Sequence, residues 1–373
     1  MAKLLKIFVD AHRFEQGYDG VRTFIKGIYS NLYLSDNTLI YFGTGDVANL
    51  QKEFPGIPEE RIIQYKYKNT LVRLGFEIPR ILRKFKFDYA HFQYVSPIIK
   101  FCKYIVTTHD MLIKDFSHEF PLSYRLSRLA LFKRSLKKAD IKTVPSIYSR
   151  DRVSFHYNIS PGELLIVPNG VDKLFFSTRG NKKEEAINHI REKYNVENYI
   201  LNVSRVEPRK NQEILLEAYL DMQLHRQGFS VVFIGKESIK NSLFKRLLNK
   251  VPENIKSKIR HIQQVSAGDL MRFYRAARIF VYPSKAEGFG LPPLEAAALG
   301  IPVLCSNTTA MSEYAFFEGN LFNPADMAEF QQKLACLLSG GYDETELEKI
   351  SSIIRNRYSW ETIAQNLAFY MRC

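Results

Sequence analysis

The sequence predicts an α/β protein made of two doubly wound, Rossmann-like domains, each with a parallel sheet covered by helices. Short apolar, β-branched runs alternate with longer stretches of helical pattern, and this alternation occurs twice along the 373 residues. Several runs are apolar on consecutive residues, as expected of strands buried on both faces. Because ligands bind beyond the carboxyl ends of the strands in such sheets, we expect the domains to face each other across a cleft lined by the loops that follow strands.

Twelve strands are expected. Those of the first half are residues 4–9, 38–42, 61–65, 89–92, 104–108, 141–144 and 164–167, and those of the second half are 199–203, 230–234, 259–262, 279–282 and 302–304. Between the two series, residues 168–172 read PNGVD, which is turn chemistry, and a polar segment follows at 179–185. We therefore predict a first domain at 1–172 and a second at 173–356. The pattern of residues 360–372 predicts an amphipathic terminal helix.

The composition favours anionic partners. Lys and Arg number 53 against 39 Asp and Glu, which gives a net charge of +14. Nucleic acid, a phosphate-rich ligand and an anionic membrane face all suit this charge. The four scattered cysteines form no disulfide framework or zinc motif, which favours reduced thiols in a cytoplasmic protein. No apolar run approaches the ~20 residues of a membrane span, and the N-terminal run is too short for a signal peptide.

The first segment with chemical character is VSRVEPRKN, residues 203–211. A strand ends there, three cations fall within six residues, and a helix begins. The helix N-terminus offers free N–H groups and a partial positive charge. With Arg205 as a bidentate donor and Lys210 as a compact charge, the segment suits a diphosphate. Taken alone, it can equally be a solvated basic loop.

The second segment is YPSKAEGFGLPPLEAAA, residues 282–298, where a strand again leads through a glycine-bearing loop into a helix. Gly288 and Gly290 allow the backbone to approach a ligand closely. Glu287 and Glu295 are eight residues apart, so both can face one cleft. A carboxylate accepts from two vicinal hydroxyls, which suits a sugar or a ribose. The alternative for Glu295 is a plain helix-start glutamate favoured by the helix dipole.

Together the two segments resemble the donor-binding half of the retaining glycosyltransferases of family 4, which have the GT-B fold. Glu287 and Glu295 match the E-x7-E motif of that family, and Arg205 and Lys210 match its donor-phosphate pair. Residues 168–172 resemble its interdomain turn. Residues 358–361, YSWE, resemble the start of its C-terminal helix, so we expect a helix at about 357–373 to pack back on the first domain.

The resemblance also implies roles. Glu295 would bind the ribose diol, and Arg205 and Lys210 would neutralise the departing diphosphate. Glu287 and the backbone amides of Phe289, Gly290 and Leu291 would hold the transferred sugar, and Ser204 and Gly288 complete the expected donor-binding set. Two cations and a helix end can replace a divalent metal at the leaving group. Since no DxD motif occupies a matching place, we predict no metal and no cofactor besides the nucleotide sugar.

The first domain supplies two further candidates. Residues 14–23 resemble the glycine-rich loop of the family, with Gly20 as the candidate for close approach to the diphosphate. Residues 107–110, TTHD, resemble its T-x-H-D segment, which would place His109 near the transferred sugar. An ordinary strand-to-helix turn and a structural histidine are the respective alternatives.

The resemblance implies a same-face substitution through an oxocarbenium-like transition state, with the leaving diphosphate accepting the proton of the acceptor. The RKN form of the phosphate loop resembles bacterial mannosyltransferases of surface polysaccharide and lipopolysaccharide synthesis that use GDP-mannose. A UDP-hexose donor is the alternative. A basic nucleic-acid-binding protein, from another class, lacks any recognition motif here, and an inactive GT-B module would lack the Glu and Arg/Lys set.

Two basic clusters interleaved with Leu and Phe, residues 80–86 and 133–138, suit a surface that meets an anionic membrane. Acceptors of related enzymes are often lipid-linked sugars. We therefore expect a saccharide or lipid-linked saccharide acceptor and a cytoplasmic enzyme in peripheral contact with the inner face of the plasma membrane, with no nucleic-acid partner. A solvated helix face explains the clusters equally well.

Overall fold

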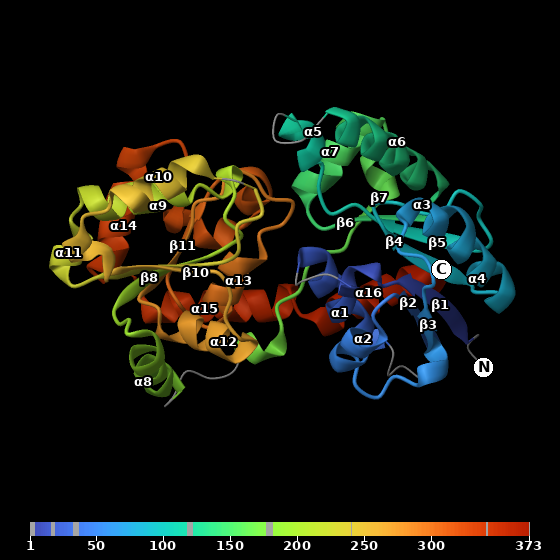
Figure 1. The fold of residues 1–373 in the computed structure, drawn as a ribbon, viewed down its shortest axis with the longest axis horizontal. Helices are drawn as coiled ribbons and strands as arrows, with labels where there is room; N and C mark the ends of the chain where they lie inside the picture. Colours follow the sequence, from blue (N-terminus) through green and yellow to red (C-terminus); the bar gives the residue numbers. More distant parts are fainter. Residues whose placement is uncertain are drawn as a thin grey trace. The chain divides into compact units, whose positions relative to one another are not determined.

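The computed structural model describes residues 4–15, 19–32, 37–117, 122–176, 182–239, 241–340 and 342–372. The chain forms two compact units, one of residues 1–170 with 358–373 and one of residues 171–357 (Figure 1). The division falls two residues before the predicted position. Within the described ranges, no helix has both the length and the apolar character that crossing a bilayer requires.

The first unit contains a seven-stranded parallel sheet in the order β3-β2-β1-β4-β5-β6-β7. Its strands are β1 (Leu5–Asp10), β2 (Thr38–Thr44), β3 (Ile62–Gln64), β4 (Tyr89–Gln93), β5 (Lys103–Thr107), β6 (Ile141–Val144) and β7 (Leu164–Ile166). The strand order reverses between β1 and β4. In doubly wound sheets this switch point is where ligands bind.

Helices cover both faces of this sheet. Ile7 and Val9 of β1 pack in one core cluster with residues of α1 (Gly20–Leu32), α2 (Val47–Glu53) and α16 (Trp360–Arg372). Phe8 points to the opposite face, where α4 (Ile78–Phe85) packs after α3 (Thr70–Val72) and the π-helical turn η3 (Arg73–Glu77). Farther along that face, Val106 packs with α6 (Leu122–Lys138) and α7 (Ile147–Tyr157), and α5 (Leu112–Asp115) precedes them. Figure 1 shows the two helical layers of this unit.

The single tryptophan fixes α16 against the first unit. Its ring packs edge-on against Phe24 of α1 at 6.2 Å between centroids. A Cβ added to Gly27 would lie 2.1 Å from the Trp360 ring, and one added to Gly170 would lie 2.6 Å from it. Glycine is required at both positions because the indole occupies the space that a side chain would need.

The second unit contains a six-stranded parallel sheet in the order β10-β9-β8-β11-β12-β13. Its strands are β8 (Tyr199–Val203), β9 (Ser230–Ile234), β10 (Ile259–Ile262), β11 (Ile279–Tyr282), β12 (Val303–Ser306) and β13 (Leu321–Phe322). The order reverses between β8 and β11. The segments that begin at residues 204 and 283 therefore leave the sheet on the two sides of its switch point.

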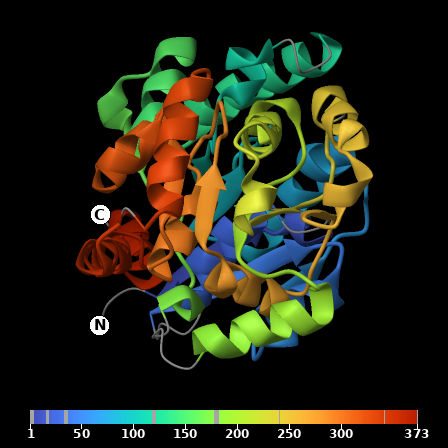
Figure 2. The same cartoon turned by 90° about the vertical axis from the view of Figure 1, so that its left-hand side faces the viewer.

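One face of this sheet packs against α9 (Gln212–Asp221), α10 (Ser242–Lys250), α11 (Glu253–Lys256) and α14 (Met327–Leu338). On the opposite face, rings of α12 (Ala267–Ala276) meet Tyr199 and Phe280, and α8 (Lys182–Tyr194) packs on α12. The helices α13 (Leu291–Ala298) and α15 (Glu344–Arg357) pack against each other. Figure 2 turns this unit toward the viewer and shows helices on both sides of its strands.

The predicted fold class is confirmed. All twelve predicted strands are present, and their ends differ from the prediction by no more than two residues. The strand β13 was not predicted; it is two residues long and pairs with Cys305 and Ser306. So short a strand carries no periodic signal of its own.

Candidate functional site

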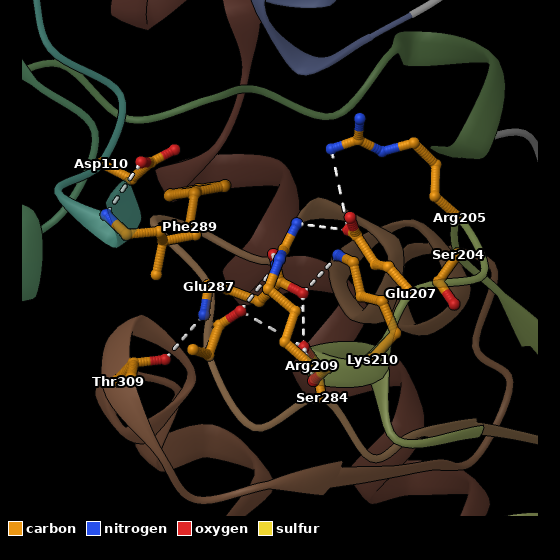
Figure 3. A network of polar contacts seen from close by, with 12 residues as sticks. Asp110, Ser204, Arg205, Glu207, Arg209, Lys210, Ser284, Glu287, Phe289 and Thr309 are labelled. Carbon is orange, nitrogen blue, oxygen red and sulfur yellow. Dashed lines mark hydrogen bonds and ion pairs between the residues drawn. The ribbon is translucent and has the colours of Figure 1, made fainter. Parts of the chain in front are cut away.

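The site of the second unit is built from the two segments that follow β8 and β11 (Figure 3). Gln212, the first residue of α9, fixes the earlier segment by donating from Nε2 to Ser204 Oγ (2.8 Å) and to the carbonyl of Arg205 (2.9 Å). A 3-10 turn, η7 (Pro208–Lys210), follows, and Asn211 then adopts a left-handed conformation with φ of 56°. The three cations of the segment therefore lie on a loop that leads into a helix start.

Lys210 and Glu287 form a buried ion pair, with 2.5 Å between Nζ and Oε1 and side chains that are 8% and 10% exposed. The same carboxylate oxygen accepts from Ser284 Oγ at 2.6 Å and from the Tyr282 hydroxyl at 2.9 Å. Lys210 also donates to the Tyr282 hydroxyl at 3.1 Å. An ammonium has three N–H groups, so these contacts leave one for another acceptor.

Lys210 and Glu287 each stabilise the ionised form of the other. Burial opposes ionisation of Glu287, but the positive charges of Lys210 and Arg209 outweigh it and lower the pKa of the carboxyl to about 2. Burial lowers the pKa of Lys210 to about 8, although Glu287 favours the charged form. At pH 7 the pair is therefore ionised on both sides, and Lys210 is the member that loses its charge on mild alkalinisation.

Arg209, to which the sequence analysis gave no role, is 9% exposed at its side chain and joins the two segments. Nη1 donates to the carbonyl of Ala286 (2.8 Å) and to Glu287 Oε2 (3.3 Å), while Nη2 donates to Glu207 Oε1 (2.5 Å). The other oxygen of Glu207 accepts from Ser238 at 3.1 Å. Local sequence could not reveal this role, because burial of the polar EPRK run depends on the second segment, about 80 residues away.

Arg205 lies in a different environment from Lys210. Its side chain is 56% exposed, and its ion pair with Glu207 is loose, at 3.8 Å (Figure 3). The two predicted phosphate ligands are thus one exposed cation and one buried cation that already has an acidic partner.

The glycine-bearing loop ends at Gly290, which caps α13 with φ of +87°. Gly288 and Phe289 are buried, and the Tyr314 hydroxyl holds the loop by donating to the carbonyl of Phe289 at 2.5 Å. Leu291 begins the helix, followed by two prolines. The first turn of a helix directs amides without intrahelical partners outward, as an anion or hydroxyl ligand requires.

Glu295 has a different hydrogen-bond partner from the Lys210–Glu287 pair. The Tyr274 hydroxyl donates to its Oε2 at 2.9 Å. Desolvation by the surrounding protein raises the pKa of Glu295 to about 7, and the negative charge of Asp172 acts in the same direction. Of the two glutamates of the predicted motif, one is held ionised and the other titrates near neutrality.

In the first unit, His109 follows β5 and forms a T-shaped contact with the Phe24 ring, 5.2 Å between centroids. Its Nε2 lies 2.7 Å from Oε1 of Gln93, the last residue of β4. Burial lowers the pKa of His109 to about 3, so the imidazole is neutral at physiological pH. Gln93 was not among the residues predicted from the sequence. Its position at a strand end next to the switch point is the signal that could have indicated it.

Gly20 is the first residue of α1, and the Asp19 side chain caps that helix by accepting from the amide of Arg22 at 2.8 Å. A Cβ at Gly20 would meet no atom within 4 Å, so no protein neighbour requires glycine there. Gln16, Gly17 and Tyr18 of the same loop lie outside the described residues. Among the residues that the structure describes, no three His, Cys, Asp or Glu side chains gather as metal ligands would.

Comparison with known families matches both units. The profile described as "Glycosyl transferases group 1" matches residues 183–357, and the profile described as "Glycosyltransferase Family 4" matches residues 27–173. A solved structure of Anabaena Alr3699/HepE in complex with UDP-glucose superposes with a TM-score of 0.74 at 16% identity, covering 98% of this chain and 99% of that one. This likeness supports the GT-B fold.

Two curated proteins of Escherichia coli are similar at lower coverage. "Serotype-specific mannosyltransferase WbdA" is 28% identical over 247 residues, which is 65% of this chain and 29% of WbdA. "O-antigen chain mannosyltransferase B" is 28% identical over 241 residues, which is 57% of this chain and 63% of that protein. The matches thus span less than a third of WbdA and under two thirds of the second protein.

Proposed function

We propose that this chain, which belongs to glycosyltransferase family 4 and has the GT-B fold, transfers a hexose from a nucleotide sugar to a saccharide or lipid-linked saccharide with retention of configuration. The observation that carries the proposal is the placement of Arg205, Lys210 and Glu287 on the two loops flanking the switch point of the second sheet. Cations and a carboxylate at that position suit a diphosphate joined to a polyhydroxylated ligand.

The chemistry follows from these groups. The bond between the anomeric carbon and the diphosphate oxygen breaks, and its electron pair stays on the diphosphate. Arg205 and the remaining N–H of Lys210 stabilise that charge, which is the main contribution to the rate. The acceptor oxygen attacks from the face that the diphosphate leaves, and a diphosphate oxygen takes the acceptor proton. Two cations and the start of α9 supply the positive charge that a divalent metal would otherwise bring.

The remaining residues bind the donor. Glu287 and the amides of Phe289, Gly290 and Leu291 hold the hydroxyls of the transferred sugar. Gly288 lets the backbone of this loop come close to the donor. Glu295 accepts from the ribose diol. Ser204 and Gly20 belong to the diphosphate environment, and His109 hydrogen-bonds with a hydroxyl of the transferred sugar as a neutral imidazole.

GDP-mannose is the proposed donor, in the synthesis of a bacterial surface polysaccharide. Its support is the similarity to proteins named as mannosyltransferases, at 28% identity. A UDP-hexose is the second candidate, favoured by the structural likeness to a protein solved with UDP-glucose.

A direct test measures the thermal midpoint of the protein with GDP-mannose, UDP-glucose and UDP-GlcNAc, followed by transfer from the responding donor to cell lipid extract. A selective rise with GDP-mannose and an α-linked product support the proposal, because GDP-mannose is itself an α-glycoside. A selective response to a UDP-sugar overturns the choice of mannose. Salt-sensitive binding of random oligonucleotides without any donor response overturns the enzyme assignment.

The proposed acceptor side includes an anionic membrane. Ile98, Ile99 and Phe101, in the loop before β5, are 63%, 52% and 41% exposed. This apolar loop lies beside the basic end of α6, because Arg134 donates to the carbonyls of Pro97 and Ile98. Exposed apolar side chains next to a basic cluster suit a surface of anionic lipid. Lys100, which donates to the carbonyl of Lys138, also pairs with Asp140 at 2.6 Å, so the cations of α6 carry the net charge.

Vesicle co-sedimentation tests this contact. The protein should bind phosphatidylglycerol vesicles and not phosphatidylcholine vesicles, and Ile98→Ser with Ile99→Ser should weaken binding severalfold. Phe155→Ser is the matched control, because Phe155 is 75% exposed at another place in the same unit. Equal loss in both variants, or no preference for anionic lipid, contradicts a specific membrane surface.

A further inference from the structure

Arg209 connects the two loops of the second unit, which follow β8 and β11, through both its side chain and its backbone. Its guanidinium bonds Glu207 on its own loop and the carbonyl of Ala286 and Glu287 on the other. Its backbone carbonyl accepts from the amide of Lys285 at 2.7 Å. The side chain is almost fully buried and its donors are directed at protein acceptors, so Arg209 is not placed to take a ligand.

The charges around Arg209 alternate in sign along a continuous chain of contacts, in the order Glu207, Arg209, Glu287, Lys210 (Figure 3). Each buried charge has an opposite neighbour, as buried ionised groups require. The four charges sum to zero, so Arg205 supplies the net positive charge of the cluster.

We propose that Arg209 is a positioning residue that acts through Glu287 and Lys210, with Glu207 as the counter-ion that holds its guanidinium in place. This inference rests on the proposed function, since it assigns Lys210 and Glu287 to donor binding. The planar fork of Arg209 contacts two acceptors on the second loop and one on the first. It thereby sets the distance between the loop bearing the ammonium and the loop bearing the carboxylate.

A lysine cannot replace this fork, because an ammonium on a flexible stem lacks the planar arrangement of five donors. Small displacements of groups that meet the reacting atoms are costly, about 10²-fold in rate for a 1 Å misplacement. Arg209→Lys keeps the positive charge and removes the planar set of donors that connects the two loops. It is therefore expected to lower kcat by at least tenfold while KM for the donor changes by less than threefold.

Removing the charge gives a second, different signature. The positive charge of Arg209 lowers the pKa of Lys210 and that of Glu287. In Arg209→Gln the pKa of Lys210 should therefore rise above its present value of about 8. Since the ammonium form is the active one, the alkaline limb of the kcat profile should move to higher pH in Arg209→Gln and stay in place in Arg209→Lys.

Arg278→Lys is the matched control. Arg278 donates to the Tyr342 hydroxyl and to the carbonyl of Leu338. It immediately precedes β11, so it lies at the amino end of that strand, whereas the two loops of the site follow the carboxyl ends of strands. The experiment measures kcat, KM and thermal midpoint for the three variants and the wild-type chain. It also measures the pH dependence of chemical labelling of Lys210, read by mass spectrometry. The labelling reports the Lys210 ammonium directly and needs no turnover.

The expected result is a loss of kcat in Arg209→Lys that exceeds the loss in Arg278→Lys at equal folded fraction, together with a Lys210 labelling midpoint shifted upward in Arg209→Gln. Unchanged kcat in Arg209→Lys overturns the positioning role. If Arg209→Gln does not fold, Arg209→Lys decides alone. If the wild-type chain transfers no sugar, the proposed function fails, and an unshifted labelling midpoint then separately overturns the coupling of Arg209 to Lys210.

Discussion

The ammonium of Lys210 lies 2.5 Å from the carboxylate of Glu287, in a position where both side chains are buried. The sequence motifs predicted two separate functions, with this cation binding the diphosphate and this acid binding the sugar. Their contact joins the two: a donor that takes the spare N–H of Lys210 meets an ammonium already oriented by Glu287. An ion held in place before the ligand arrives needs little reorganisation when charge develops on the leaving group.

Arg205 and Lys210 should respond differently to truncation. Arg205→Ala removes an exposed side chain, so the thermal midpoint should stay within a few degrees while kcat falls about 10²–10³-fold. Lys210→Ala should lower kcat similarly and also destabilise the second unit by about 3 kcal/mol, because it removes the nearer of the two cations that Glu287 contacts and leaves one uncompensated negative charge among buried groups. Steady-state kinetics and urea unfolding measure both. Near-normal turnover in both variants would refute their assignment to the diphosphate.

Donor affinity should depend on pH through Glu295. Its pKa is raised to about 7, so the carboxyl is largely protonated at pH 6 and ionised at pH 8. Only the carboxylate accepts hydrogen bonds from both ribose hydroxyls, so donor binding should strengthen by about tenfold from pH 6 to pH 8. Calorimetric titration with the donor at three pH values checks this, and Glu295→Gln should bind weakly and lose the rise in affinity between pH 6 and pH 8. An equally steep profile in that variant would assign the titration to another group.

Gln93 should control the state of His109. Glu at position 93 would place a carboxylate 2.7 Å from Nε2 and raise the pKa of the imidazole from about 3 toward the neutral range. In Gln93→Glu, titration of His109 should therefore make kcat vary with pH between 5 and 8. In the wild-type chain His109 does not titrate in this range, so it contributes no pH dependence to kcat there. Nitrogen NMR shifts of His109 give the protonation state independently. The exposed Gln64, at the end of β3, supplies the control Gln64→Glu.

Gly27→Ala should destabilise the first unit by about 1–3 kcal/mol, because the new methyl group collides with the Trp360 ring. Combining it with Trp360→Leu should cost less than the sum of the two single changes, since the smaller side chain vacates the space. Urea unfolding of the four proteins of this cycle measures the coupling. Strict additivity would mean that the helix α16 does not pack on α1 in solution.

Activity should survive removal of divalent metal. In the proposed mechanism, Arg205, Lys210 and the start of α9 supply the positive charge for the diphosphate, so dialysis against EDTA should leave kcat within twofold. Restoration of a lost rate by Mg²⁺ or Mn²⁺ would show that these cations do not suffice. Arg205→Ala, assayed with and without added metal, tests whether a metal can replace the missing charge.

Much of the fold was predictable because a parallel strand of ordinary length has a local sequence signature. The run at residues 279–282 is apolar on consecutive residues and lies between a helical pattern and a glycine-bearing loop, and β11 forms there. The terminal helix was predictable over residues 360–372 from its amphipathic period. The two-residue strand β13 was not, because its pairing with β12 is the only thing that defines it.

The candidate site was likewise predictable from the sequence only in part. Motif spacing predicted Arg205, Lys210, Glu287 and Glu295 as one set, since both loops follow strands and the carboxyl ends of parallel strands lie on the same side of the sheet. It could not show that Arg209 faces inward while Arg205 is exposed, although both lie on one loop. That difference depends on whether a carboxylate or carbonyl from the other loop comes within hydrogen-bonding distance.

The amino-acid order by itself determined the type and sequence of the elements, the family and the chemical kinds of group available. Only the tertiary structure decided which of those groups are neutralised within the protein, as Lys210 is by Glu287, and which titrate near neutrality, as Glu295 does. The physical reason is the separation along the chain of the residues that interact. Helical and strand patterns depend on neighbours a few residues apart, whereas the burial and ion pairing of these groups depend on residues about 80 positions apart that the fold brings into contact.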